Sequence, residues 1–253
     1  MNTPSPSLDA QLTARLKGLK IPRHLAIIMD GNGRWALARG RPRMEGHIEG
    51  ARAVERLFDA AYAVGVRYLS VFAFSTENWE RPAAEVNGLM RLLTDYLGRA
   101  GERRPGVRFV WAGEDDGALP HPIVAKLKKL AADTAGEDRM TIAIAINYGG
   151  RQEIVAAVKR AHEAGKIAGL TVENFREHLV GGDRPDIDFV IRTSGERRIS
   201  NFMLWQLAYA EMFFPDYHWP DFDATRLVEA VEEFNRRDRR FGAIKEGDAN
   251  VSA

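Results

Sequence analysis

Residues 24–35 constrain the fold more than any other stretch of this chain. Residues 25–29 form a short apolar run without charge, which is typical of a strand buried on both faces of a parallel sheet. A polar turn follows at once, composed of Asp30, Gly31, Asn32, Gly33 and Arg34. Glycine allows a positive φ and lets a ligand approach main-chain N–H groups. Where such a turn opens a helix, the free N–H groups form an anion site, at the strand end where open α/β folds bind their ligands.

Asp30 in this turn allows two interpretations. A carboxylate beside a phosphate-binding turn suits a divalent cation, because Mg²⁺ prefers oxygen-rich sites with few protein ligands. The alternative is a tight strand-to-helix turn in which Asp30 caps the helix. The spacing matches neither a Gly-x-Gly-x-x-Gly fingerprint nor a Walker loop, so both interpretations stay open on the residues alone.

The composition limits the classes of protein to which the chain can belong. Its 253 residues suffice for one well-buried domain. With 36 basic and 35 acidic residues the net charge is +1, so no global field attracts nucleic acid or acidic lipid. The absence of cysteine excludes structural disulfides and thiolate metal sites, and it fits a reducing cytoplasm. Residues 1–20 lack the apolar core of a signal peptide. We expect a loose arm there, a domain over residues 21–242 and a tail over residues 243–253.

Two further polar clusters follow predicted strands. Residues 66–74 are rich in β-branched and aromatic side chains, and they lead into Ser75, Thr76, Glu77, Asn78, Trp79 and Arg81. Residues 187–191 lead into a segment with three arginines and three hydroxyl groups, namely Arg192, Thr193, Ser194, Arg197, Arg198 and Ser200. Because the carboxyl ends of parallel strands meet at one edge of a sheet, these clusters would face each other. Arginines and hydroxyls together suit a second oxyanion or a diphosphate.

Less specific explanations exist for several of these residues. Ser75 and Thr76 also fit a capped turn, and Trp79 fits plain packing. The basic run over residues 34–43 is typical of a solvated face, although an arginine after a phosphate loop can grip phosphate oxygens with its planar fork. His47, near a helix start, is more often a structural hydrogen-bonding residue than a catalyst.

The whole pattern predicts an α/β protein, a single three-layer domain with a central, mostly parallel six-stranded sheet flanked by helices. Further strand-like runs cover residues 107–111 and 141–146. We expect a helix over residues 201–210. In a helix over residues 151–164, we expect Ile154, Val155 and Val158 to face the sheet.

Glu211 stands alone before the apolar residues 212–214. A single carboxylate among such neighbours is unfavourable unless it is paired, protonated or bound to a cation. Glu211 therefore needs a partner that the sequence does not show.

Long, ordered strings of this chain resemble the signatures of one family. The strings are MDGNGRW (29–35), FSTENW (74–79), NYGGR (147–151), RTSGE (192–196), RISNF (198–202), WQ (205–206), YAE (209–211) and WPDF (219–222). On these strings the chain resembles the cis-prenyltransferases, and among them the bacterial undecaprenyl diphosphate synthases. The resemblance extends over about residues 21–242, nearly the whole chain.

The resemblance implies an enzyme that adds isopentenyl diphosphate repeatedly to an allylic diphosphate, usually farnesyl diphosphate, making each new double bond cis. It implies a cofactor, Mg²⁺, held by Asp30 in a metal site that Glu211 completes, and it places Asn78 where a residue helps to remove the proton. The allylic diphosphate would be cradled by Gly31, Asn32, Gly33, Arg34 and Arg43. The substrate sites would be lined by Trp35, His47, Ser75, Thr76, Glu77, Trp79 and Arg81. The diphosphate of isopentenyl diphosphate would be bound by Arg192, Arg198, Ile199 and Ser200. One departure is Arg197, which stands where some bacterial members have histidine and adds positive charge there.

A growing prenyl tail needs an apolar tunnel, because each buried CH₂ contributes ~0.8 kcal/mol. Ala73 is small, which would leave the tunnel open near its mouth and favour a long product, such as undecaprenyl diphosphate for a cell-wall lipid carrier. The candidate walls are Val54, Leu57, Met90, Leu93, Ile142 and Ile144.

Two alternatives share the same fold. One is a synthase of short or medium chains with a blocked tunnel, and the other is a non-catalytic partner subunit, which would be expected to lack the acid and glycine turn that is intact here. A nucleotide-dependent phosphotransferase is disfavoured by the later basic clusters and by the lack of a Walker lysine. The family is typically homodimeric, and residues 240–242 resemble a C-terminal element that reaches the neighbouring active site. We expect a cytoplasmic homodimer with no nucleic-acid partner and with peripheral membrane contact only through its product.

Overall fold

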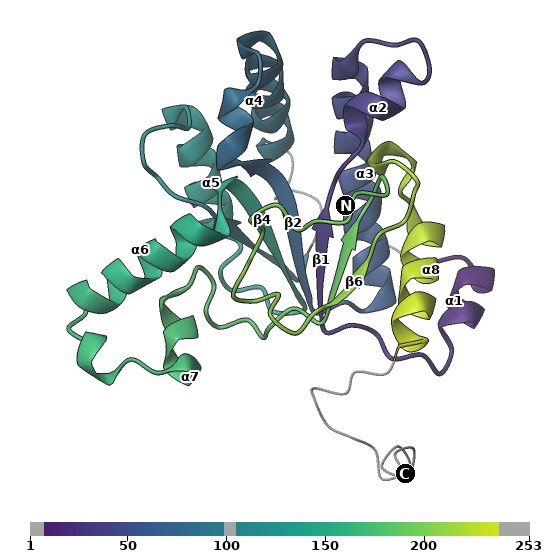
Figure 1. Cartoon of the computed structure of the whole chain (residues 1–253). Coiled ribbons are helices and arrows are strands. Elements are labelled where there is room, and N and C mark those ends of the chain that lie inside the picture. The colour runs from purple at the N-terminus through teal and green to yellow at the C-terminus, as the bar shows by residue number, and fades with distance from the viewer. Residues whose placement is uncertain (1–7, 99–104, 238–253) are drawn as a thin grey trace, which may run out of the picture.

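Six parallel strands form the central sheet of the computed structural model, which describes residues 8–98 and 105–237 (Figure 1). In space the strands follow the order β3-β4-β2-β1-β5-β6. Their bounds are His24–Ile28 (β1), Tyr68–Ser75 (β2), Val107–Ala112 (β3), Met140–Tyr148 (β4), Phe189–Arg192 (β5) and Glu211–Phe213 (β6). Every neighbouring pair is parallel, so all the carboxyl ends lie at one edge. The predicted six-stranded α/β fold is confirmed, and the sheet is entirely parallel.

Helices flank this sheet on both sides (Figure 1). The α-helices are Ala10–Leu16 (α1), Asn32–Leu37 (α2), Arg43–Val64 (α3), Ala83–Leu97 (α4), His121–Asp133 (α5), Gly150–Glu163 (α6), Val172–Phe175 (α7) and Ala224–Asn235 (α8). Short 3₁₀ helices span Thr76–Glu80 (η1), Ile167–Gly169 (η2), Arg176–His178 (η3) and Trp219–Asp221 (η4). Within the described ranges, no helix combines the length and the apolar character needed to cross a bilayer.

Strand β1 shows how the two faces of the sheet are built. All of its residues are buried, as expected for a strand covered on both sides. Leu25 and Ile27 belong to the large core that includes side chains of α3, α4, α5 and α8. Ala26 and Ile28 point to the opposite face, where they pack with Phe202 and other residues of the segment 199–212. The alternation follows from the two-residue period of a strand.

Residues 201–210 form a series of turns and not the predicted helix. Ser200, Asn201 and Met203 have φ angles of 49°, 61° and 39°, and this left-handed backbone is incompatible with a right-handed helix. Phe202, Met203 and Leu207 are buried all the same. The apolar pattern therefore predicts burial correctly and the helix wrongly.

Helix α6 lies where the sequence predicts it, but it presents a different face to the protein. Val155 and Val158 are 55% and 42% exposed, so the prediction that they face the sheet is wrong. The buried positions are instead Gly150, Glu153, Ala157 and Ala161, and Ala157 packs with Phe175 and Leu179.

Residues 8–20, which the sequence assigns to a loose arm, contain helix α1, and α1 packs against α8. Asp9 caps α1 by accepting a hydrogen bond from Leu12 N at 2.8 Å. Arg15 donates two hydrogen bonds to the Glu232 carboxylate, at 2.9 and 2.8 Å. The prediction of a loose arm is therefore wrong for this part of the chain.

His24, the first residue of β1, is buried between two polar partners. Its Nδ1 lies 2.8 Å from the Pro185 carbonyl oxygen and its Nε2 lies 2.9 Å from Ser70 Oγ. Burial, reinforced by the cationic Arg184, lowers the pKa of His24 to about 3. The folded protein thus keeps this imidazole neutral at a pH where the unfolded chain would protonate it.

We expect the free energy of unfolding to fall as the pH drops below about 6.5, by up to about 1.4 kcal/mol per pH unit, because the unfolded chain then binds a proton that the folded chain does not. Urea unfolding between about pH 7 and pH 5 measures this slope. A His24→Asn variant, which has no titratable group there, should show a shallower slope. Equal slopes for the two proteins would show that His24 does not cause this pH dependence.

Candidate active site

A polar cleft lies at the carboxyl edge of the sheet, beside the ends of β1, β2 and β5. It holds about 1410 Å³ of space, part of it open to solvent. Most of the predicted site residues line it, namely Asp30, Gly31, Asn32, Gly33, Arg34, Arg43, His47, Ser75, Glu77, Asn78, Arg81, Arg192, Arg198 and Ser200. The fold therefore brings together three clusters that follow three different strands.

The Asp30 carboxylate follows β1 and accepts hydrogen bonds on both oxygens. Its Oδ1 accepts from Gly31 N at 2.7 Å and from Arg34 Nη2 at 3.1 Å, and its Oδ2 accepts from Arg192 Nη2 at 2.8 Å. Burial alone would raise the pKa of Asp30, but Arg192, Arg34 and the Gly31 N–H together hold this pKa below its usual range. Asp30 is therefore ionised at neutral pH.

Gly31 occupies a position that leaves no room for a side chain, whereas a side chain at Gly33 would displace the exposed guanidinium of Arg43. Gly31 has a φ of 100°, and a Cβ atom there would lie 2.6 Å from Ser194 Oγ. A Cβ atom on Gly33 would lie 2.6 Å from Arg43 Nη1. The positive φ of Gly31 agrees with the sequence analysis, but the close approaches at both glycines come from the protein's own side chains.

Arg192 is the most deeply buried arginine among those that line the cleft, with a side chain only 5% exposed. Its Nη1 donates to the Arg198 carbonyl oxygen at 2.7 Å and to Ser200 Oγ at 2.8 Å, while Nη2 donates to Asp30. The Arg198 guanidinium is exposed, pairs with Glu196 and lies 4.0 Å from Asp30 Oδ2. The third cluster thus combines one buried, fixed cation, Arg192, with two exposed cations, Arg197 and Arg198.

The end of β2 continues directly into η1, of which Glu77 and Asn78 line the cleft. Asn78 Oδ1 accepts a hydrogen bond from Ser75 N at 3.1 Å and closes a capping box. Glu77 Oε1 accepts a hydrogen bond from Asn201 Nδ2 at 3.1 Å. Burial would raise the pKa of Glu77, but backbone and side-chain hydrogen bonds, including the one from Asn201, hold this pKa below its usual range.

Glu85, in the first turn of α4, lies among three predicted site residues although the sequence analysis does not single it out. Its carboxylate is 3.4 Å from Arg43 Nε, 3.2 Å from Arg81 Nη1 and 3.3 Å from His47 Nε2. Burial would raise the pKa of Glu85, but Arg43 and Arg81 hold it below its usual range. Burial lowers the pKa of His47, so its imidazole is neutral at neutral pH. The spacing of four residues between Arg81 and Glu85 is the sequence signal that could have revealed this pair.

Two predicted site residues, the tryptophans of the first two clusters, do not line the cleft. Trp35 is buried, and its Nε1 donates to Asp221 Oδ1 at 2.7 Å. Trp79 packs edge-on against Phe74, and its Nε1 donates to Asn147 Oδ1 at 2.9 Å. Both indoles therefore anchor the loops that carry the lining residues.

Thr76 and Ile199 also lie outside the lining. Thr76 Oγ1 accepts a hydrogen bond from Gln152 Nε2 at 3.5 Å, and Ile199 packs against the apolar cluster on the second face of the sheet. Conversely, several residues that line the cleft are not among those predicted from the sequence, namely Ile28, Met29, Phe72, Leu89 and Asn201. Four of these are apolar, and an apolar side chain at a strand or helix position is read from sequence as core.

Within one chain, Glu211 lies at the amino ends of the strands, whereas Asp30 lies at their carboxyl ends. Glu211 opens β6 beside Phe189, which in turn pairs with Leu25 of β1. Asp30 is five residues further along the chain, roughly 16 Å in the strand direction. The Glu211 carboxylate instead pairs with Arg237 Nη1 at 3.3 Å. The predicted metal site of Asp30 and Glu211 is therefore not formed within a single chain.

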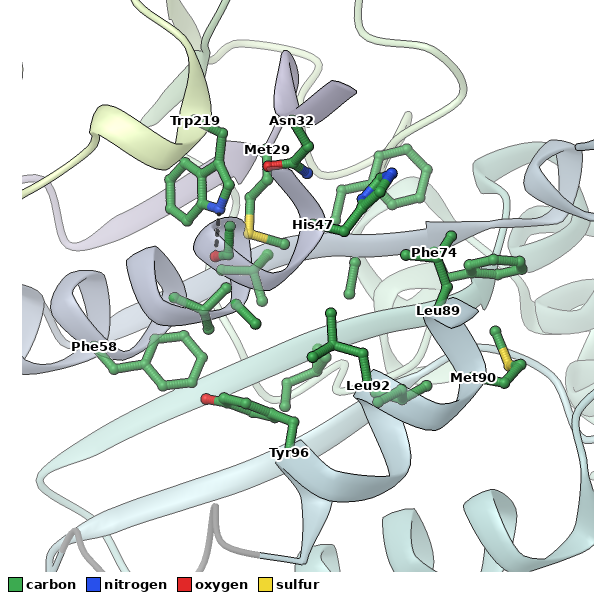
Figure 2. Close-up of a pocket in the computed structure, with 18 residues that line it drawn as sticks. Met29, Asn32, His47, Phe58, Phe74, Leu89, Met90, Leu92, Tyr96 and Trp219 are labelled. Carbon is green, nitrogen blue, oxygen red and sulfur yellow. Dashed lines mark hydrogen bonds between the residues drawn. The ribbon is translucent and has the colours of Figure 1, made fainter. Parts of the chain in front are cut away.

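An apolar cavity adjoins the cleft between the sheet and helices α3 and α4 (Figure 2). It holds about 780 Å³ of space, its open part included. Figure 2 shows Phe58 and Tyr96 on one side of it and Asn32 and His47 on the other. Its wall is made chiefly by Ala51, Val54, Phe58, Val71, Ala73, Phe74, Leu89, Met90, Leu92, Leu93, Tyr96, Ile144 and Trp219.

Four of the six predicted tunnel walls line this cavity, namely Val54, Met90, Leu93 and Ile144. Leu57 and Ile142 do not line it, and both are buried in the large core. Cleft and cavity share six lining residues, which are Met29, Asn32, His47, Phe72, Ala73 and Leu89. They therefore form one continuous space with a charged mouth and an apolar interior, and Ala73 lies where the two parts meet.

Two of the described carboxylates line the cleft, those of Asp30 and Glu77, and the one beside the glycine turn, that of Asp30, fits Mg²⁺. Among residues 8–98 and 105–237, no group of three His, Asp or Glu side chains is arranged to hold a metal ion. Mg²⁺ commonly binds one or two carboxylates and completes its shell with phosphate oxygens and water. The Asp30 carboxylate is ionised and remains 26% exposed, so it meets this requirement.

A mouth lined by arginines and an apolar interior suit a ligand with an anionic head group and a hydrocarbon tail. Residues 28–242 match the family described as "Putative undecaprenyl diphosphate synthase". The chain belongs to the undecaprenyl diphosphate synthase family of isoprenyl transferases, the cis-prenyltransferases.

Similar proteins come from distant organisms. The isoprenyl transferase of Thermotoga maritima is 46% identical over 234 residues, which cover 90% of this chain and 100% of that protein. The isoprenyl transferase of Bacillus subtilis is 46% identical over 238 residues and 90% of each chain. Among solved structures, lavandulyl diphosphate synthase from Lavandula x intermedia in complex with dimethylallyl diphosphate has a TM-score of 0.82 at 31% identity, covering 87% of this chain and 98% of that one. A "probable undecaprenyl diphosphate synthase" from Campylobacter jejuni has a TM-score of 0.74 at 31% identity, covering 88% and 100%.

Proposed function

We propose that this isoprenyl transferase condenses isopentenyl diphosphate repeatedly onto an allylic diphosphate, farnesyl diphosphate in the first round, and releases a long-chain polyprenyl diphosphate. The observation that carries the proposal is the direct opening of the cationic cleft into the apolar cavity. A diphosphate can remain among arginines in the cleft while the tail lengthens in the cavity, where each CH₂ contributes ~0.8 kcal/mol. The product proposed is undecaprenyl diphosphate, the precursor of a cell-wall lipid carrier.

The cleft offers two places for two diphosphates, which repel each other and need separate cations. The allylic diphosphate would lie at the turn 31–34, beside Arg34 and Arg43. The diphosphate of isopentenyl diphosphate would lie beside Arg192, Arg198 and Ser200. Holding both substrates in register makes the bimolecular step effectively unimolecular.

In each round the allylic C–O bond breaks, and the electron pair leaves with the diphosphate. A new C–C bond then forms to isopentenyl diphosphate, and loss of a proton creates the cis double bond. Arg34 in the turn 31–34, with Arg43 beside it, would stabilise the leaving anion electrostatically. Asn78, whose amide is oriented by Ser75 N, would help to remove the proton. Mg²⁺, held by Asp30, would supply further stabilisation of the diphosphate charge.

The second subunit of a homodimer is part of this proposal. Glu211 lies at the opposite edge from Asp30 in its own chain, so a metal site with both carboxylates would require another copy. Residues 240–242, which the resemblance assigns to the neighbouring active site, lie outside the described residues. Light scattering would give twice the mass of the chain, and a fully active monomer would argue against the dimer.

A synthase of shorter chains is the second candidate, because lavandulyl diphosphate synthase shares the fold with a TM-score of 0.82. A non-catalytic subunit is less well supported, since the acid and glycine turn at residues 30–34 is intact. Incubation with farnesyl diphosphate, labelled isopentenyl diphosphate and Mg²⁺, followed by chromatographic sizing, separates the three. Long products support the proposal, short products support the second candidate, and no product contradicts both.

Ala73→Leu is expected to shorten the products. Ala73 is exposed at the junction of cleft and cavity, in β2 where its register with β4 shifts. A leucine there would narrow the passage through which the tail enters. Product length on chromatography measures the effect, and an unchanged length would contradict the assignment of this passage. Val155→Leu, on the exposed face of α6, is the matched control and should leave the products unchanged.

A further inference from the structure

The motif at residues 147–151 has no part in the mechanism above, although it is one of the strings that mark the family. Its two glycines make room for Asn201 together with Gln152 and Leu204. A Cβ atom on Gly149 would clash with Gln152 Oε1 and lie 2.7 Å from Asn201 Nδ2, and one on Gly150 would lie 2.7 Å from Leu204 Cγ and 3.0 Å from the Asn201 carbonyl oxygen. The start of α6 is therefore shaped to receive this asparagine.

Asn201 uses every polar group of its side chain. Its Oδ1 accepts a hydrogen bond from Arg151 N at 2.9 Å, and its Nδ2 donates to Glu77 Oε1 and to Gln152 Oε1, both at 3.1 Å. Its carbonyl oxygen accepts a hydrogen bond from Gly150 N at 2.6 Å. The partners fix the orientation of the amide, because a backbone N–H can only donate and an ionised carboxylate can only accept.

These contacts connect two parts of the cleft that are far apart in the chain. Glu77 follows β2, whereas Asn201 directly follows Ser200, which accepts a hydrogen bond from Arg192. Asn201 itself lines the cleft and has a φ of 61°, a conformation that asparagine tolerates better than most residues. Its side chain is thus the link between Glu77 and the Arg198–Ser200 turn.

We propose that Asn201 is a positioning residue, which holds Glu77 and the Arg198–Ser200 turn at a fixed separation through the start of α6. The inference rests on the proposed function, because that function assigns the two groups to the substrate sites. Asn201 acts through its neighbours, so its removal changes the alignment of the two substrates rather than the charge of either diphosphate site.

A reciprocal exchange tests this role. Asn201→Asp replaces the donor by a carboxylate facing Glu77, and the lost hydrogen bond and the repulsion should lower kcat/KM for isopentenyl diphosphate by ~10- to 100-fold. In Glu77→Gln/Asn201→Asp the introduced amide can donate to the introduced carboxylate, and Gln152 can turn its amide to donate as well. On the Glu77→Gln background, Asn201→Asp should therefore lower kcat/KM by less than about threefold.

Equal losses on the two backgrounds, or no loss in Asn201→Asp, would overturn the inference. The inference would also be overturned if the substitutions at Glu77 and Asn201 had non-additive effects on the free energy of unfolding but additive effects on kcat/KM. The role of Asn201 would then be purely structural. Asn174→Asp is the matched control, since Asn174 also caps a backbone N–H, that of Thr171 at 2.8 Å, in the exposed helix α7. It should leave kcat/KM unchanged.

Calorimetric binding of isopentenyl diphosphate to the same four proteins separates this inference from the proposed function. Binding needs no turnover, and the coupling between Glu77 and Asn201 should appear in the dissociation constants. Coupled binding without any product would overturn the proposed function alone. Additive effects on binding would overturn the positioning role of Asn201.

Discussion

Replacing Asp30 by asparagine is expected to lower kcat by ~10³-fold, in the range found when a group that stabilises transition-state charge is removed. The carboxylate is ionised, pairs with Arg192 and Arg34, and is the one that we propose to hold Mg²⁺. Asparagine keeps its shape and can still accept the hydrogen bond from Gly31 N, so the fold should persist. Steady-state kinetics with isopentenyl and farnesyl diphosphates would measure the loss.

Asp183→Asn is the control for this variant. Asp183 also pairs with an arginine, Arg108, at 2.7 Å, but in an exposed pair. Its replacement should leave kcat unchanged, and circular dichroism should show both variants folded. If folded Asp30→Asn kept more than about a tenth of the wild-type kcat, Asp30 could not be the central acid, since each tenfold change reflects only ~1.4 kcal/mol.

Replacing Arg192 by lysine should lower kcat/KM for isopentenyl diphosphate by ~100-fold, mostly through KM. The guanidinium holds the Arg198 carbonyl oxygen, Ser200 Oγ and Asp30 at the same time. Lysine keeps the positive charge, but its single ammonium group cannot reproduce this planar fork. The Arg198–Ser200 turn would therefore lose its support, while the charge of the site would not change.

The matched control is Arg226→Lys, at an exposed pair with Glu229 in α8. Exposed pairs contribute little, so its kinetic constants should equal those of the wild type. A KM for isopentenyl diphosphate that is unchanged in Arg192→Lys would show that charge alone matters at this position. The KM for the allylic substrate should change less, because that diphosphate would lie at the turn 31–34.

The residues that form the cleft could largely be predicted from sequence, because a parallel sheet imposes a simple rule. Apolar runs mark strands that are buried on both faces, and the polar residues after each run must lie at the same edge. Asp30, Glu77 and Arg192 follow three different strands and line one cleft in the structure.

The irregular parts of the chain could not be predicted in this way. Residues 201–210 carry the apolar content of a helix, yet Phe202 stacks flat on Phe72 at 4.5 Å between ring centroids. The small Ala143 and Ala145 on this face of the sheet leave room for such close packing. Tertiary packing overrides helix propensity here, because propensity amounts to less than about 1 kcal/mol per residue.

The sequence by itself determined where strands β1 to β5 lie, that they are buried, and which types of side chain follow them, since these depend on periodicity and on residue type. It did not reveal the short strand β6. The tertiary structure alone decided which partner each polar side chain has. Glu211 pairs with Arg237 and lies far from Asp30. Glu85 lies within 3.4 Å of Arg43, Arg81 and His47. Asn201 forms hydrogen bonds both with Glu77 and with the start of α6. Such contacts depend on how turns direct the chain through space, and no local pattern of residues encodes that path.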